Sequence, residues 1–301
     1  MGAILCNTVG NTLLPVVLFE GKEPARASNF GNGFVGLGFV ATPLVIVTLI
    51  HDAGLSYGAT LAVIGAVLLA FAVVAAAAQY PGVSTGFEFA TAVKLLREPI
   101  VLVAALALVC YIGLEWSMNT WTRPVMTEIF GGQGDAAAER NAGLVLALFG
   151  LSIAVGRFAA SAVKNLSRVG PAVIAGMALL AMVAIFGLAR TTTPGLGVLA
   201  VLVVGLAFAP MFPTIVGVTF AGFDSSRYGS IFGIIFSIGL LGSVVLPNAI
   251  GAFSEGRTVQ QSLPIAAFMA GVLLILAVVM RLVSRRYGLP QNEQPRTEVS
   301  P

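Results

Sequence analysis

The sequence predicts an all-α integral membrane protein with about nine transmembrane helices. Of its 301 residues, 57% are apolar and only 10% are charged, whereas about 25% of the residues in an ordinary soluble domain are charged. A mean hydropathy of +0.97 means more apolar surface than one soluble core can bury, so lipid is the expected solvent for most of the chain. The apolar runs are continuous rather than alternating, which excludes a transmembrane β-barrel.

A helix needs about 20 apolar residues to cross a bilayer. The predicted helices, of which the first is short, span residues 3–18, 28–50, 55–79, 99–121, 141–163, 169–189, 196–221, 229–252 and 262–284. Most connections are short and polar, which predicts antiparallel neighbours, and the longer loops are expected at 80–98 and 122–140. Four prolines are expected to kink their helices: Pro43, Pro210, Pro213 and Pro247.

These helices fall into two groups. Residues 1–80 are expected to form a partial N-terminal bundle of three helices, 81–98 a cytoplasmic central loop, 99–285 a C-terminal six-helix bundle, and 286–301 a disordered cytoplasmic tail. Lys and Arg divide 12 to 4 between two sets of loops and ends, 16 in all. By the positive-inside rule the richer set, which includes Arg157, faces the cytoplasm. The expected location is the cell (inner) membrane.

Several classes of protein are excluded. The formal net charge of +3 does not indicate a nucleic-acid partner, because the basic residues lie between apolar runs and not in one patch. Two cysteines inside apolar segments and a single histidine predict neither a disulfide framework nor a metal site. Without a nucleophile–base set at membrane depth, no enzyme is predicted. The expected partners are the lipid bilayer and a small-molecule substrate, with no cofactor beyond coupling protons, and the protein is expected to be a monomer.

Two regions of the chain resemble each other. Around Arg26 and again around Arg227, a proline-containing helix meets a loop that carries an acid and then the arginine, and a glycine-rich helix follows. This recurrence predicts parallel repeats of a six-helix unit. The nine helices then correspond to helices 4–12 of a twelve-helix fold, with three helices expected to be missing from the front. The alternative is chance recurrence of glycine-rich hairpins.

The clearest polar residue at membrane depth is Glu115. Tyr111, Glu115 and Asn119 are spaced by four residues and share one helix face, with Trp116 beside them. Polar atoms next to a large aromatic plane suit a hydroxylated or aromatic substrate, and a carboxylate in a low-dielectric cavity binds a proton more readily. Glu115 is therefore a candidate for proton coupling. The alternative places it near the outer interface, hydrated or bonded to a neighbouring helix.

Asn7 and Asn11 are also four residues apart and are candidate substrate ligands. Amide groups offer both donors and acceptors, as sugar hydroxyls or other polar neutral solutes require. Hydrogen bonding between helices is the alternative use of such residues in membranes. Asn29 and Asn32, at the start of the next predicted helix, are expected to serve packing or capping near the cytoplasmic interface.

Charged residues on the predicted cytoplasmic side are candidates for a gate. Ion pairs across the two halves would lock the inward face shut, and their breakage would open it. The candidate gating residues are Arg26, Arg157, Asp224 and Arg227. The alternative is that they act only as solvated topology signals.

Several segments resemble the major facilitator superfamily. PMFPTIVGVTFAGF with the following GSIFGIIFSIGLLGSVVLPNAIG resembles its helices ten and eleven, VGRFAASAVKNLSRVG its Gly-Arg motif between helices eight and nine, and ASNFGNGFVGLGFVATPLV its fifth helix. YIGLEWSMNTW is similar to the seventh helix of the fucose permease-like branch of sugar:proton symporters. The resemblance covers most of residues 1–285. It departs from the family in two ways: helices one to three are absent, and Asn7 stands where that branch carries a glutamate.

The resemblance implies transport of a small solute by alternating access, with proton-coupled uptake or efflux of a sugar or another polar metabolite. Two alternatives remain open at this stage. One is a truncated remnant that does not transport, and the other is a mis-called start of a complete transporter.

Overall fold

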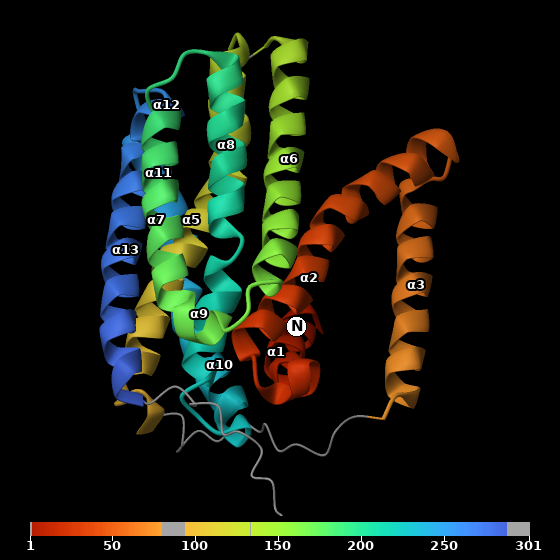
Figure 1. The fold of residues 1–301 in the computed structure, drawn as a ribbon. Helices are drawn as coiled ribbons and strands as arrows, with labels where there is room; N and C mark the ends of the chain where they lie inside the picture. Colours follow the sequence, from red (N-terminus) through yellow and green to blue (C-terminus); the bar gives the residue numbers. More distant parts are fainter. Residues whose placement is uncertain (1, 80–93, 133, 288–301) are drawn as a thin grey trace, which may run out of the picture.

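The computed structural model describes residues 2–79, 94–132 and 134–287, which form helices and the turns between them (Figure 1). Within these residues, eight helical spans are long and apolar enough to cross a membrane, which confirms the predicted all-helical membrane fold. Three of the spans, Pro194–Phe220, Ser225–Phe253 and Val259–Ser284, each contain two of the helices labelled in Figure 1. Helix α1 has only 16 residues and is not among the eight. The bounds are α1 (Gly2–Val17), α2 (Pro24–Val47), α3 (Tyr57–Ala77), α5 (Pro99–Phe130), α6 (Ala136–Ser161), α7 (Leu166–Leu188), α8 (Pro194–Phe208), α9 (Met211–Phe220), α10 (Tyr228–Gly239), α11 (Leu241–Phe253), α12 (Val259–Ser262) and α13 (Pro264–Ser284).

The expected long loop at 122–140 is wrong. Helix α5 continues through Pro124 to Phe130, so only residues 131–135 join it to α6. Val125 and Met126 are fully buried, and the Met126 side chain lies against Gly197 of α8. Tertiary packing therefore extends this helix past the point where the apolar run ends. Of the central loop predicted at 81–98, residues 81–93 lie outside the described residues, as do residues 288–301 of the predicted tail.

Helices α5 to α13 form one bundle, and α1 and α2 lie against its lower part in Figure 1. The core of the bundle is aromatic and aliphatic, with Phe149, Phe208, Phe220 and Phe232 fully buried. Helix α2 leans away from α6 toward its upper end, and α3 stands apart and is exposed along most of its length. The lower end carries the start of α2 and the end of α13, which the sequence predicts to be cytoplasmic.

Helix α2 makes its closest contacts with the C-terminal bundle through small residues. A Cβ on Gly36 would lie 2.9 Å from the Cα of Ala154 on α6. A Cβ on Gly217 of α9 would overlap the backbone of Ala25 at the start of α2. Small side chains let helices approach this closely in a membrane. At its lower end, α2 is therefore packed tightly against the other half of the protein.

At the upper end of the C-terminal bundle, the Glu128 carboxylate links α5 to the start of α12. The Glu128 side chain, on α5, accepts hydrogen bonds from the Val259 N–H at 3.1 Å and the Gln260 N–H at 3.3 Å. These are unsatisfied donors of the first turn of α12. The Gln260 amide in turn donates to the carbonyl oxygens of Leu188 and Thr191 after α7.

We expect Glu128→Ala to lower the free energy of unfolding by about 1–2 kcal/mol, because the variant leaves these donors without an acceptor. Thermal unfolding in detergent measures the change. The matched control is Glu139→Ala, which removes an exposed ion pair with Arg123 that spans 3.8 Å. This control should alter stability by no more than about 0.5 kcal/mol. Equal effects of the two substitutions would contradict the role assigned to Glu128.

Candidate functional site

The site is built around Arg157, which lies on α6 four residues before its last residue and is 4% exposed. Its Nη2 donates to the Glu115 carboxylate at 3.2 Å and to the Tyr111 hydroxyl at 3.3 Å. Its Nη1 donates to the Asn32 carbonyl at 3.2 Å, and its Nε donates to the Ala209 carbonyl at 3.4 Å. One guanidinium thus connects α2, α5, α6 and the junction of α8 and α9.

The sequence predicted a cytoplasmic gating residue at Arg157, with a solvated topology signal as the alternative. Arg157 is not solvated: neighbouring helices enclose it, and its ion pair is with Glu115 of the same C-terminal bundle. Its gating role stays a prediction. A buried guanidinium requires an opposite charge and acceptors for its N–H groups, and this site supplies both.

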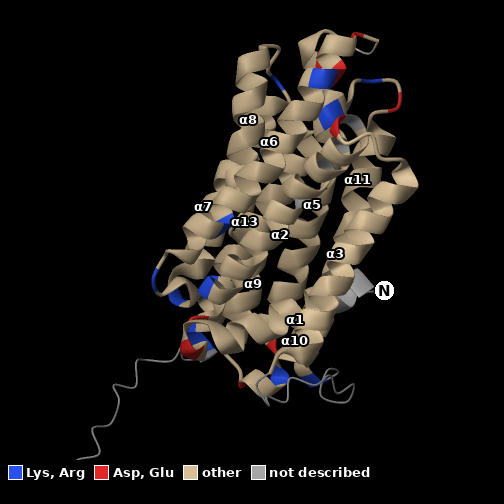
Figure 2. Ribbon diagram, turned by 90° about the vertical axis from the view of Figure 1, so that its right-hand side faces the viewer, with Lys and Arg blue, Asp and Glu red and all other residues tan. Residues whose placement is uncertain are grey.

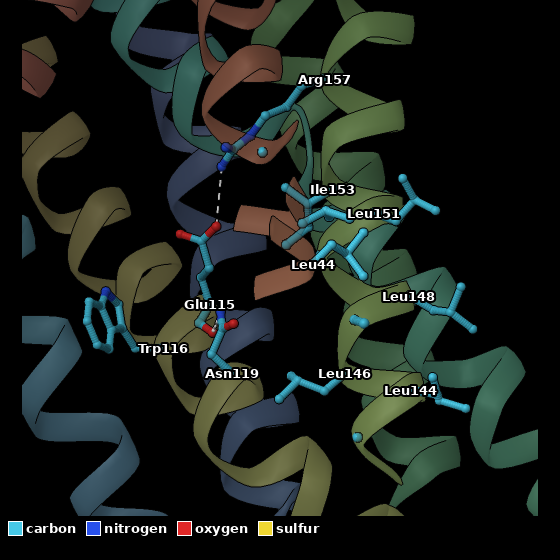
Figure 3. Close-up of a pocket in the computed structure, with 15 residues that line it drawn as sticks. Leu44, Glu115, Trp116, Asn119, Leu144, Leu146, Leu148, Leu151, Ile153 and Arg157 are labelled. Carbon is cyan, nitrogen blue, oxygen red and sulfur yellow. Dashed lines mark hydrogen bonds and ion pairs between the residues drawn. The ribbon is translucent and has the colours of Figure 1, made fainter. Parts of the chain in front are cut away.

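A cavity of about 830 Å³ opens beside the ion pair. Figure 3 shows Glu115 and Asn119 on one side of it and leucine side chains of α6 on the other. The polar residues of the lining are Glu115, Asn119 and Arg157, with Trp116 beside them. The remaining lining consists of glycine and aliphatic residues of α2 and α6, including Gly36, Val40, Leu44, Gly143, Leu148 and Leu151. The cavity therefore has one polar side and one apolar side.

Three of the predicted substrate-binding residues line this cavity: Glu115, Trp116 and Asn119. The Glu115 side chain is 24% exposed, whereas that of Arg157 is 5% exposed. Solvent therefore reaches the carboxylate more readily than its partner. The Asn119 amide donates to the Glu115 carbonyl at 2.8 Å. Tyr111 is fully buried and accepts a hydrogen bond from Arg157, and it is not part of the lining. Its substrate-binding role stays a prediction.

Asn7 and Asn11 also lie outside the cavity lining. Asn11 is 4% exposed, and its Oδ1 accepts from Asn32 Nδ2 at 2.8 Å. Its own amide donates to the Asn7 carbonyl at 3.0 Å. The Asn11–Asn32 bond links α1 to α2, which favours the alternative of helix–helix bonding. The substrate-binding roles of Asn7 and Asn11 stay predictions.

Asn32 is the member of this network that sequence reasoning did not assign to the site. It was expected to pack or cap near the membrane interface. Its side chain instead bonds to Asn11, and its carbonyl accepts from Arg157. The sequence does contain a pattern that points to this role: Asn32 and Gly36 are four residues apart and so share one face of α2. Only the tertiary structure places that face against α6.

The two halves also meet at the predicted cytoplasmic end. Arg26 Nε donates to the Ser161 carbonyl at 2.9 Å, and the Glu23 carboxylate accepts from the Asn165 N–H at 3.0 Å. These contacts use backbone groups in place of the expected ion pairs. Among residues 2–79, 94–132 and 134–287, neither Asp224 nor Arg227 makes an ion pair. The gating roles of Arg26, Asp224 and Arg227 stay predictions. Figure 2 shows charged residues gathered at the two ends of the helices.

Comparison with solved structures supports the fold. The E. coli fucose:proton symporter FucP, in its N162A form, superposes with a TM-score of 0.71 at 19% identity, over 93% of this chain and 74% of that chain. A structure of the transporter FucP in the outward conformation superposes with a TM-score of 0.70 at 21% identity, over 91% and 72% of the respective chains. No curated protein matches the sequence.

The family model described as Major Facilitator Superfamily matches residues 5–247. That match covers most of the chain, including every residue of the Arg157 network. The chain belongs to the major facilitator superfamily and is a multi-pass membrane transporter.

Proposed function

We propose that the protein carries out proton-coupled transport of a small hydroxylated solute, such as a sugar, with Glu115 as the proton-binding group. The observation that carries this proposal is the 3.2 Å contact between Glu115 and the buried Arg157 at the edge of the cavity. An ionisable pair at membrane depth is typical of proton and substrate pathways. A sugar:proton symporter among the similar structures is consistent with this assignment.

The ion pair couples proton binding to the contact between the two halves. When Glu115 is ionised, it shares the Arg157 guanidinium with Tyr111 and the Asn32 carbonyl. Protonation neutralises the carboxylate and leaves Arg157 without a counter-charge in a low-dielectric environment. We expect Arg157 to move when its counter-charge is lost. Because Arg157 donates to the Asn32 carbonyl on α2, this movement would be transmitted to the N-terminal helices.

The structure corresponds to a state closed at the predicted cytoplasmic end. Helix α2 packs against α9 there, and Asn29 Nδ2 donates to Thr214 Oγ1 at 3.0 Å between the two helices. The cavity lies toward the opposite end, along the upper parts of α2 and α6. Alternating access requires the lower contacts to separate while the upper ends of the two halves approach.

The residues that line the cavity indicate which class of solute it would bind. Glu115, Asn119 and Arg157 offer hydrogen-bond donors and acceptors on one side, and aliphatic side chains cover the other. This arrangement suits a solute with one hydroxylated edge and one apolar face better than a polyol that is polar all round. We further propose that transport uses no cofactor, that the protein acts as a monomer, and that it resides in the cell (inner) membrane.

A non-transporting remnant is less well supported. Buried ion pairs contribute little to stability compared with apolar packing of the same volume. Glu115 and Arg157 nevertheless lie together at a cavity in a membrane protein, where such a pair is a functional feature by default.

We expect Glu115→Gln to abolish the pH dependence of uptake, because glutamine keeps the shape and hydrogen bonding of the side chain but binds no proton. The measurement is uptake of radiolabelled fucose, other deoxyhexoses and hexoses into proteoliposomes, with and without an inward proton gradient. Glu139→Gln removes an exposed carboxylate and should behave as the wild type. If Glu115→Gln responded to the gradient as the wild type does, Glu115 would not be the coupling residue.

A further inference from the structure

The Ala209 carbonyl lacks its usual helical donor. Ala209 and Pro210 both keep right-handed helical backbone angles between α8 and α9, with φ −47° and −79°. In a continuous helix the Ala209 carbonyl would accept from the N–H four residues later. That residue is Pro213, which has no N–H. Ala209 is fully buried, where an unpaired carbonyl is costly.

Arg157 supplies the missing donor. Its Nε donates to the Ala209 carbonyl at 3.4 Å, while its Nη2 donates to the Glu115 carboxylate. Because a guanidinium is planar and its donors have a fixed geometry, an acceptor at Nε restricts where Nη2 can point. The Ala209 carbonyl therefore helps to direct Arg157 toward Glu115.

The neighbouring residue allows this contact. A Cβ on Gly156 would lie 2.5 Å from the Ala209 Cβ and 3.4 Å from the Leu206 carbonyl oxygen. Since glycine has no side chain, α6 lies directly against the α8–α9 junction at this level. The next residue along α6, Arg157, then reaches the carbonyl that the proline leaves open.

We propose that Pro213 is a positioning residue for the proton-coupling pair, acting by reserving the Ala209 carbonyl for Arg157. This inference rests on the proposed function of Glu115 and Arg157, and it adds a residue that contacts neither the cavity nor the carboxylate. Pro213→Ala supplies an N–H at the position where the Ala209 carbonyl accepts a helical hydrogen bond. The new donor competes with Arg157 Nε for that carbonyl.

A double-mutant cycle tests the proposal without a substrate. Melting temperatures are measured in detergent for the wild type, Pro213→Ala, Arg157→Gln and the double variant. With Arg157 present, Pro213→Ala should lower the melting temperature, because Arg157 loses an acceptor. With Arg157→Gln, the same substitution should raise the melting temperature, because the new N–H satisfies a carbonyl that has lost its donor.

Pro210→Ala, at the junction of α8 and α9, is the matched control. It supplies an N–H to the Leu206 carbonyl, which Arg157 does not contact, so its effect should be the same in both backgrounds. If Pro213→Ala shifted the melting temperature equally with and without Arg157, the positioning role would be wrong, whatever the outcome of the uptake experiments.

The proton dependence of uptake separates positioning from a structural role. Uptake of the labelled sugars into proteoliposomes is compared with and without an inward proton gradient for the wild type, Pro213→Ala and Pro210→Ala. Pro213→Ala should weaken the response to the gradient, because a less restrained Arg157 pairs with Glu115 less often. Pro210→Ala should respond as the wild type does. A wild-type response in Pro213→Ala would overturn the proposal.

Discussion

Replacing Arg157 by glutamine is expected to abolish transport and to lower the free energy of unfolding by about 3 kcal/mol. Removing one partner of a buried ion pair leaves the other charge uncompensated, which costs roughly 3–5 kcal/mol. The low end of that range applies because the Glu115 side chain is 24% exposed and water can reach it. The measurements are chemical or thermal unfolding in detergent and uptake into proteoliposomes.

Two further variants isolate the ion pair from the rest of the substitution. The double variant Glu115→Gln and Arg157→Gln should recover much of the lost stability, because it removes both charges together. Arg190→Gln is the control for losing an arginine, since Arg190 is exposed and lies 4.9 Å from the Phe186 ring. This control should change stability by no more than about 1 kcal/mol, the upper value for an exposed cation–π contact. No recovery in the double variant would show that the pair is not the source of the loss.

Gly217→Ala is expected to shift the protein away from the state described here. The added methyl group would overlap the Ala25 backbone, which no side-chain rotation can relieve. Helix α2 must then separate from α9, breaking the Asn29–Thr214 hydrogen bond at the predicted cytoplasmic end. We expect a population shift toward the cytoplasm-open state and at least about a tenfold fall in uptake, since a shift of 1.4 kcal/mol changes an equilibrium tenfold.

Thiol labelling measures this shift directly. Ser28 on α2 is 1% exposed, so a cysteine at this position in a background without Cys6 and Cys110 should react slowly with a maleimide. Gly217→Ala should increase the labelling rate several-fold. The matched control, Gly176→Ala on α7, adds a methyl group where no atom lies within 4 Å and should leave the rate unchanged. Equal rates in the two variants would contradict a closed contact at Gly217.

Much of the fold was readable from the sequence because lipid imposes one requirement on every span. Each span must satisfy its backbone hydrogen bonds internally, so about 20 apolar residues indicate a helix wherever they occur. The boundaries were less accurate where packing extends a helix. Polar residues such as Thr122 and Thr127 of α5 are buried against neighbouring helices, and no local pattern distinguishes them from loop residues.

For the site, the sequence by itself determined that a carboxylate, an asparagine and an indole share one region of α5, because spacing along a single helix sets which residues are neighbours. Which arginine meets Glu115 was decided only by the tertiary structure. Arg157 is 42 residues from Glu115 in the chain and 125 from Asn32, and it reaches both because α6 packs closely against its neighbours at glycine residues. Contacts of this kind depend on helix packing across the bundle, and local sequence does not encode them residue by residue.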